Sequence, residues 1–181
     1  EHLHQTTEPT LFAPVNYLIH QQEKWMGSHE KMWQIANHYS ATGPNPCWKA
    51  LIAFAKIEEW LWFAAFEDDR DLKKAYSDRR FSQEFKDEIA TLDAEFWSAL
   101  KDFDGEIPES EKRFAHDYFG GLSFKLGDKA LARPHMEAIG PHISELPWIY
   151  MSAGSKDLMK NWNNLRKQVG LEGFYADSND G

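Results

Sequence analysis

The residues best suited to proton transfer are two histidines in the second half of the chain. His116 is followed directly by Asp117 in a segment with helical periodicity and aromatic neighbours. A buried histidine beside a carboxylate can act as a general base, because the carboxylate fixes which ring nitrogen carries the proton. His135 follows a proline further along the chain. His116, Asp117 and His135 are therefore candidate catalytic residues; the alternative is that they are ordinary structural residues.

Two other pairs have the spacing of metal ligands on a helix. His20 and Glu23 are three residues apart, as are His142 and Glu145, so each pair would share one helix face. The di-iron pattern of helical bundles is Glu-x-x-His on two facing helices. Here the order is reversed and Pro147 follows the second pair. Surface polar residues are the preferred interpretation, and a metal site is the alternative.

A haem site is a further alternative, because a helical protein with 8 tryptophans and 12 phenylalanines can enclose a porphyrin. Its axial ligand would be His20, His116 or His135. Residues 111–121 followed by His135 are similar to the distal helix, Gly-Gly turn and proximal histidine of truncated globins. His20 is similar to the early proximal histidine of haem-oxygenase-like folds. The two similarities exclude each other and each covers few residues, so neither identifies a family.

Acidic residues are concentrated between Glu84 and Glu111. This window holds ten acidic residues and two lysines, a net charge of −8 in a chain whose formal net charge is −9. An apolar stripe in the same segment faces the core, so the acids are expected to project outward together. Such a surface attracts a basic partner, as in immunity proteins and nuclease inhibitors; the alternative is a solvated face. The candidate partner-binding residues are Glu84, Asp87, Glu88, Glu95, Asp102, Asp104 and Glu106.

Composition narrows the remaining classes. Cys47 is the only cysteine, which excludes an internal disulfide framework and a cysteine-based zinc site, and we expect it to be a small buried residue. The negative charge argues against direct contact with nucleic-acid phosphates. No run of about 18 apolar residues predicts a membrane span. The given chain begins at Glu1 and has no signal-like segment, so we expect a soluble protein and predict no compartment.

Helical periodicity runs through most of the chain and must position these groups. Ser28 and Ser82 are typical N-caps, and Gly120-Gly121 is typical of a helix end. Residues 46–67 are apolar on more than one face, which predicts a central, buried helix. Trp33 and Trp97 lie off the apolar stripes, so we expect them to pack a second neighbour or line a pocket. The expected helices cover residues 14–26, 28–42, 46–67, 82–103, 108–121 and 155–170, with a short helix or loop at 72–80.

Together these elements predict an all-α protein, an irregular bundle of five to seven helices with a long broken segment near residues 122–154. We expect a single helical domain over residues 1–181, with irregular tails at 1–12 and 176–181. The first functional hypothesis is an interaction protein whose acidic face binds a basic partner, like an immunity protein or inhibitor. The alternative is a haem- or metal-dependent enzyme with an aromatic-lined pocket around His116 or His135.

Overall fold

The fold is all-helical, as predicted. The computed structural model describes residues 10–22, 27–141, 143–151 and 157–174, and these ranges contain no strand. They hold eight α-helices, one more than the upper end of the expected range, and two short 3-10 helices. No helix in these ranges has the length and apolar character needed to cross a membrane. The elements are α1 (Phe12–His20), α2 (His29–Thr42), η2 (Pro46–Lys49), α3 (Ala50–Ala65), α4 (Arg70–Arg80), α5 (Gln83–Asp102), α6 (Glu109–Lys125), α7 (Lys129–Ile139), η3 (Trp148–Met151) and α8 (Leu158–Gln168).

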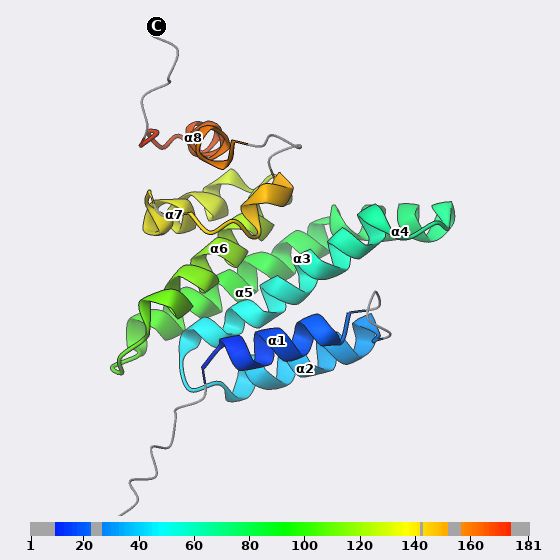
Figure 1. Ribbon diagram of the computed structural model, residues 1–181, viewed down its shortest axis with the longest axis horizontal. Helices are drawn as coiled ribbons and strands as arrows, with labels where there is room; N and C mark the ends of the chain where they lie inside the picture. The colour runs from blue at the N-terminus through cyan, green and yellow to red at the C-terminus, as the bar shows by residue number, and fades with distance from the viewer. Residues whose placement is uncertain (1–9, 23–26, 142, 152–156, 175–181) are drawn as a thin grey trace, which may run out of the picture.

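The helices pack in successive layers (Figure 1). The α1 and α2 helices lie side by side, α2 packs on α3, α3 packs on α6, and α6 packs on α7. The α8 helix lies beyond α7, whereas α4 extends away from the body and has no buried residue. Ser28 and Ser82 cap α2 and α5, and each hydroxyl accepts a hydrogen bond from a backbone N–H three residues later. Both N-cap predictions are therefore confirmed.

The most buried, central helix is α6; the 46–67 segment, expected to be central and buried, is buried only over its first part. Every residue from Phe114 to Ser123 is buried, and so is Glu111. In α3 the buried residues all lie in the first half, between Ala50 and Ile57. The aromatic residues of its second half are only partly buried. Phe63 stacks on Tyr76 of α4, with ring centres 4.1 Å apart, and Trp62 stacks on Phe66, just after α3, at 5.3 Å. A wide apolar surface on α3 thus reflects local aromatic stacking rather than burial on all sides.

The expected helix end at Gly120-Gly121 is also wrong, because α6 continues to Lys125. A Cβ atom at position 120 would lie 3.0 Å from Cβ of His135 and 3.5 Å from the Trp148 ring. The glycine therefore allows α7 and η3 to approach the α6 backbone closely. The segment 122–154, expected to be broken into one or two short helices and long loops, contains α7, which includes Pro134, and the short η3.

Buried polar side chains of α6 fix its neighbours. The Glu111 carboxylate accepts hydrogen bonds from the backbone N–H of Leu11 at 2.9 Å and from the Asn45 side chain at 2.8 Å. Glu111 also lies in the first turn of α6, where the helix dipole favours a negative charge. One carboxylate thereby holds the start of α1 and the loop before η2 against the central helix.

This arrangement predicts that Glu111→Ala destabilises the protein by about 3 kcal/mol, because it leaves two donors without their acceptor in the interior. Urea unfolding measures the effect. Glu109→Ala is the matched control, since Glu109 is in the same helical turn but exposed, and solvent screens its ion pair with Lys112, so we expect this variant to change stability little. Equal losses in the two variants would contradict the role given to Glu111.

Candidate functional site

The two candidate histidines meet inside the protein. Nδ1 of His116, on α6, lies 2.9 Å from Nδ1 of His135, on α7. Nε2 of His135 in turn hydrogen-bonds to the Asp93 carboxylate on α5. All three residues are buried, and His135 has no exposed surface. The chain Asp93–His135–His116 therefore connects three helices through the core.

A carboxylate accepts hydrogen bonds, so His135 donates from Nε2 to Asp93. Between the two imidazoles, the tautomer decides which Nδ1 donates and which accepts. Burial, and secondly the neighbouring His135, lowers the pKa of His116 from 6.5 to about 4. A base this weak is poorly matched to proton transfer near neutral pH. The geometry thus favours a structural role for the histidine pair.

Asp93 is the partner of the histidine pair that the sequence analysis does not identify. It belongs to the acidic window of residues 84–111, whose acids are expected to face outward, but it is 3% exposed and hydrogen-bonded to His135. The sequence spacing does indicate that Asp93 is buried, because it lies four residues after Ile89 and three before Phe96, on the buried stripe of α5. Trp97 packs on both imidazoles, at ring distances of 5.3 Å and 5.0 Å. The expectation that this tryptophan has a second neighbour is confirmed.

Asp117 does not face His116, although the two are adjacent in sequence. Its Oδ1 accepts a hydrogen bond from the indole N–H of Trp148 at 2.7 Å. Its Oδ2 is buried and has no hydrogen-bond partner of good geometry. Burial raises the pKa of this carboxyl from 3.8 to about 6, and it outweighs the Ser144 hydroxyl, Trp148 and Arg113, which lower the pKa. Asp117 can therefore change its protonation state close to neutral pH.

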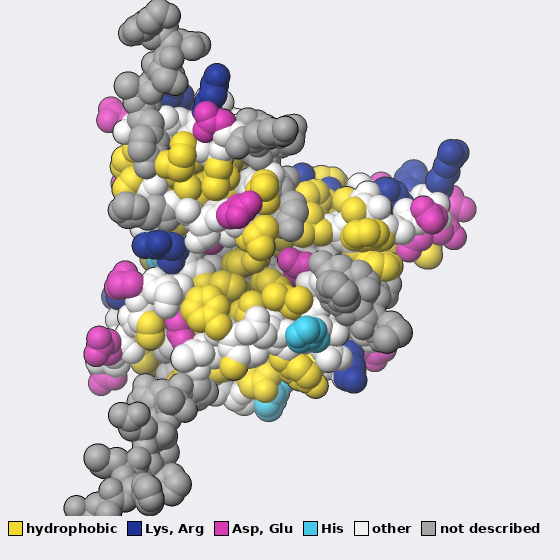
Figure 2. All heavy atoms as spheres, viewed as in Figure 1, with side chains coloured by type: hydrophobic (Ala, Val, Ile, Leu, Met, Phe, Trp, Pro, Cys, Tyr) yellow, Lys and Arg dark blue, Asp and Glu magenta, His cyan; other side chains and the backbone are white. Residues whose placement is uncertain are grey.

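Asp117 lies at one wall of an apolar cleft, which we call the Asp117 cleft. Its volume is about 550 Å³, within the range of ligand pockets. Figure 2 shows hydrophobic side chains gathered on this face, between α1 and the helices at the opposite end of the molecule. The cleft is lined by Phe12, Val15, Ile19, Phe54, Glu58, Ser110, Arg113, Phe114, Asp117, Tyr118, Ser144, Glu145 and Leu146.

Of the two histidine–glutamate pairs, the structure describes one member each, His20 and Glu145. His20 is exposed at the end of α1, and Glu145 lies on the rim of the Asp117 cleft. Glu23 and His142 lie outside the described residues. Within the described ranges, no three histidine, cysteine, aspartate or glutamate side chains are grouped to hold a metal ion. Cys47 is fully buried, as expected, and burial raises the pKa of its thiol to about 12.

All seven candidate partner-binding carboxylates lie on the surface. Three of them already have partners: Glu88 pairs with Lys56 at 2.7 Å, Glu95 pairs with Lys49 at 3.3 Å, and Asp87 accepts from Gln83. The expectation that all the acids of this window project outward is wrong for Asp93 and Glu111, which are buried because they lie on the core faces of α5 and α6. The acidic surface is therefore less charged than the sequence indicates.

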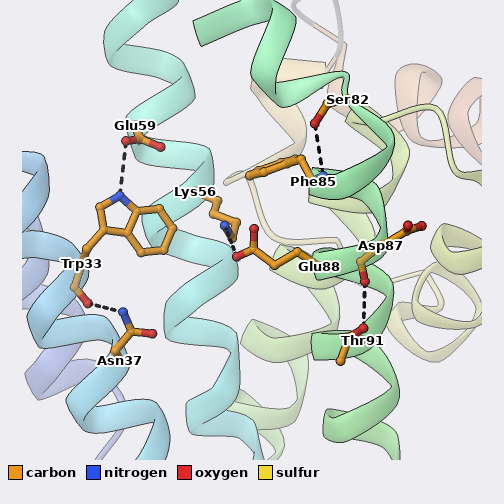
Figure 3. Close-up of polar contacts among 9 residues, drawn as sticks. All are labelled: Trp33, Asn37, Lys56, Glu59, Ser82, Phe85, Asp87, Glu88 and Thr91. Carbon is orange, nitrogen blue, oxygen red and sulfur yellow. Dashed lines mark hydrogen bonds and ion pairs between the residues drawn. The ribbon is translucent and has the colours of Figure 1, made fainter.

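A second hollow, which we call the α5 groove, is lined mainly by residues of α2, α3 and α5; Figure 3 shows polar contacts among several side chains of these helices. Lys56 crosses it toward Glu88, with Trp33 and Phe85 on either side. The lysine is 4% exposed, its ammonium lies 4.6 Å and 4.4 Å from the centres of those rings, and burial lowers its pKa. Trp33 also donates its indole N–H to Glu59. Both residues line the groove, so the expectation that Trp33 lines a pocket is confirmed. Lys56 is therefore the cation that the Glu88 carboxylate and the rings of Trp33 and Phe85 bind, so these groups have no need of a cationic ligand.

The depressed pKa of His116 predicts a specific loss of stability in acid. Between about pH 6.5 and pH 4 the unfolded chain binds a proton at this position and the folded protein does not. The free energy of unfolding therefore decreases by on the order of 3 kcal/mol as the pH falls through this range. We expect His116→Gln to lack this loss. Urea unfolding at neutral pH and near pH 4 measures it. His38→Gln, at an exposed position of α2, should behave like the wild type; an unchanged pH dependence in His116→Gln would contradict the assignment.

Comparisons with known proteins do not assign a family. No protein-family model matches the chain, and no curated protein or solved structure matches it.

Proposed function

We propose that this protein binds a small amine with an aromatic or aliphatic body in the Asp117 cleft. The observation that carries the proposal is the buried Asp117 carboxylate, which keeps one oxygen without a well-formed hydrogen bond at the wall of an apolar cleft. A buried polar atom without a partner is costly, and a donor on a ligand would remove that cost. Alternatively, the carboxyl is a structural acceptor for Trp148 alone.

The lining of the cleft suits both the apolar body and the charged amine of such a ligand. Rings of Phe54, Phe114 and Tyr118 pack on one another, with the Phe54 and Tyr118 centres 5.1 Å apart, and offer an apolar surface to the body of the ligand. Glu145 adds a second carboxylate at the rim of the same cleft, and Arg113 is the one cationic residue among its described lining residues. This excess of negative charge favours a positively charged group over an anion.

The raised pKa of Asp117 gives the proposal a pH dependence. Near neutral pH the carboxyl is mostly ionised and can form a charge-assisted hydrogen bond with an ammonium group. As the pH falls through about 6 it takes up a proton and loses that attraction. Affinity for an amine should therefore fall on acidification.

Phenethylamine is a suitable probe, with hydrocinnamate as the same ring carrying the opposite charge. We expect saturable NMR shifts at residues of the cleft with the amine and none with the acid. Asp117→Asn, which keeps the shape of the side chain, should weaken amine binding by about tenfold or more, because hydrogen bonds to charged groups are worth about 1.5–3 kcal/mol. Asp87→Asn, on the exposed face of α5, is the matched control. Equal binding by hydrocinnamate, or by Asp117→Asn, would overturn the proposal.

The acidic surface supports a second proposed function, binding of a basic protein partner. Glu84, Asp102, Asp104 and Glu106 are exposed on α5 and the loop that follows it, and none of them has an ion pair or hydrogen bond among the described residues. Unpaired carboxylates are the part of this surface that remains available to a basic partner. They steer association more strongly than they hold the complex.

An octa-arginine peptide tests this second proposal. Its NMR perturbations should centre on the C-terminal end of α5 and weaken between low and physiological salt, because salt screens exposed charges. Reversal to lysine at Asp102, Asp104 and Glu106 should reduce the affinity about tenfold. A control reversal uses three acids elsewhere: Asp71, Asp78 and Glu137. Equal effects of the two triple variants would show only a general charge effect and contradict a dedicated surface.

A further inference from the structure

Two cationic side chains converge on Trp60 from different helices. The Lys125 ammonium, at the end of α6, lies 3.9 Å from the centre of the indole ring. The Arg80 guanidinium carbon, at the end of α4, lies 5.5 Å from the same centre and 4.3 Å from that of Phe81. Both positive charges therefore lie close to the same indole ring. None of these residues lines the Asp117 cleft.

No carboxylate in the described part of the chain pairs with either cation. Among the described residues, neither Arg80 nor Lys125 forms an ion pair, whereas Lys49, Lys56, Lys74 and Lys112 each have an acidic partner. The contrast is informative because the chain has 29 acidic residues and only 20 lysines and arginines. Burial lowers the pKa of both groups, and the charge of Arg80 lowers that of Lys125 further. The two positive charges thus oppose each other in a partly desolvated place.

The surrounding groups offset only part of this repulsion. The indole face attracts cations, and each of the two helix C-termini supplies roughly half a negative charge. About one positive charge is therefore left over. In addition, Nε of Arg80 is buried and has no hydrogen-bond acceptor. An unsatisfied guanidinium donor beside a second cation is the arrangement that an oxyanion completes.

We propose that Arg80 and Lys125 bind a phosphate group beside Trp60. A guanidinium presents parallel N–H groups that match two oxygens of a phosphate, and a lysine adds a point charge. Phosphate carries between one and two negative charges near neutral pH. This is enough to balance the positive charge that the two helix C-termini do not offset. Phe81 is 47% exposed, so a ring or other apolar group attached to the phosphate can lie against it. The ligand class is a free phosphate ion or a small phosphate monoester.

Inorganic phosphate and phenyl phosphate are the two probes, each titrated at constant ionic strength while the Trp60 indole N–H is followed by NMR. We expect a saturable shift in the millimolar range with at least one of them. Tighter binding of phenyl phosphate identifies a monoester as the ligand, and equal binding identifies the free ion. A shift that does not saturate with either probe would overturn the proposal.

Variants test whether the two cations are responsible. Arg80→Gln and Lys125→Gln should each weaken binding about tenfold or more, and Arg80→Lys should retain only part of the affinity because it keeps the charge but loses the paired donors. Lys101→Gln, an equal charge change on the exposed face of α5, should bind like the wild type. Thermal unfolding gives an independent readout, since phosphate should stabilise the wild type but not the glutamine variants. Equal stabilisation of all of them would contradict the proposal.

Discussion

The burial of α6 is the constraint on which the rest of this structure depends. A helix enclosed on nearly every side removes its polar side chains from water, and each then needs a partner from another element. Glu111 is satisfied by Leu11 and Asn45, and His116 is satisfied by His135. These bonds fix where α1, η2 and α7 lie around the central helix. The fold is thus organised by the polar groups of its most buried helix as well as by its apolar surface.

Asp117 is the member of this set that is incompletely satisfied. Trp148 uses one of its oxygens, and the other lies without a well-formed hydrogen bond beside an apolar cleft. The two histidines, in contrast, hydrogen-bond to each other, and His135 also bonds to Asp93. A group whose hydrogen bonds are complete stabilises the fold, whereas one with spare capacity can recognise a ligand. This difference explains why the proposed function rests on Asp117 and not on the histidines.

Sequence reasoning recovered the helical class because it rests on periodicity and local caps, which Ser28 and Ser82 illustrate. It also singled out His116, His135 and Asp117, but not how they are paired. Neighbouring residues on a helix point about 100° apart, so His116 and Asp117 face different elements. The partner that completes the histidine chain is Asp93, a carboxylate 42 residues before His135. Pairing of this kind depends on the tertiary packing of α5 against α7, which local periodicity does not specify.

Gly120 makes the same point for the backbone. A Gly-Gly pair is typical of a helix end, yet here it permits a close approach by α7 and η3 in mid-helix. The charge pattern was likewise misleading in part, because a count of acids does not separate buried carboxylates such as Asp93 from exposed ones. In each case the residue type was informative, while its meaning depended on which neighbour the fold brings to it.

The most direct test of this account is the ionisation of Asp117 itself. Carbon-13 NMR of the aspartate side-chain carboxyls, assigned with Asp117→Asn, reports the pH at which this group titrates. The account predicts a midpoint at a pKa of about 6, well above the ordinary 3.8, because burial disfavours the charged form. It also predicts that an amine bound in the cleft lowers the midpoint, since the ammonium favours the carboxylate. A midpoint near 3.8, unaffected by phenethylamine, would contradict a desolvated carboxyl poised for a ligand.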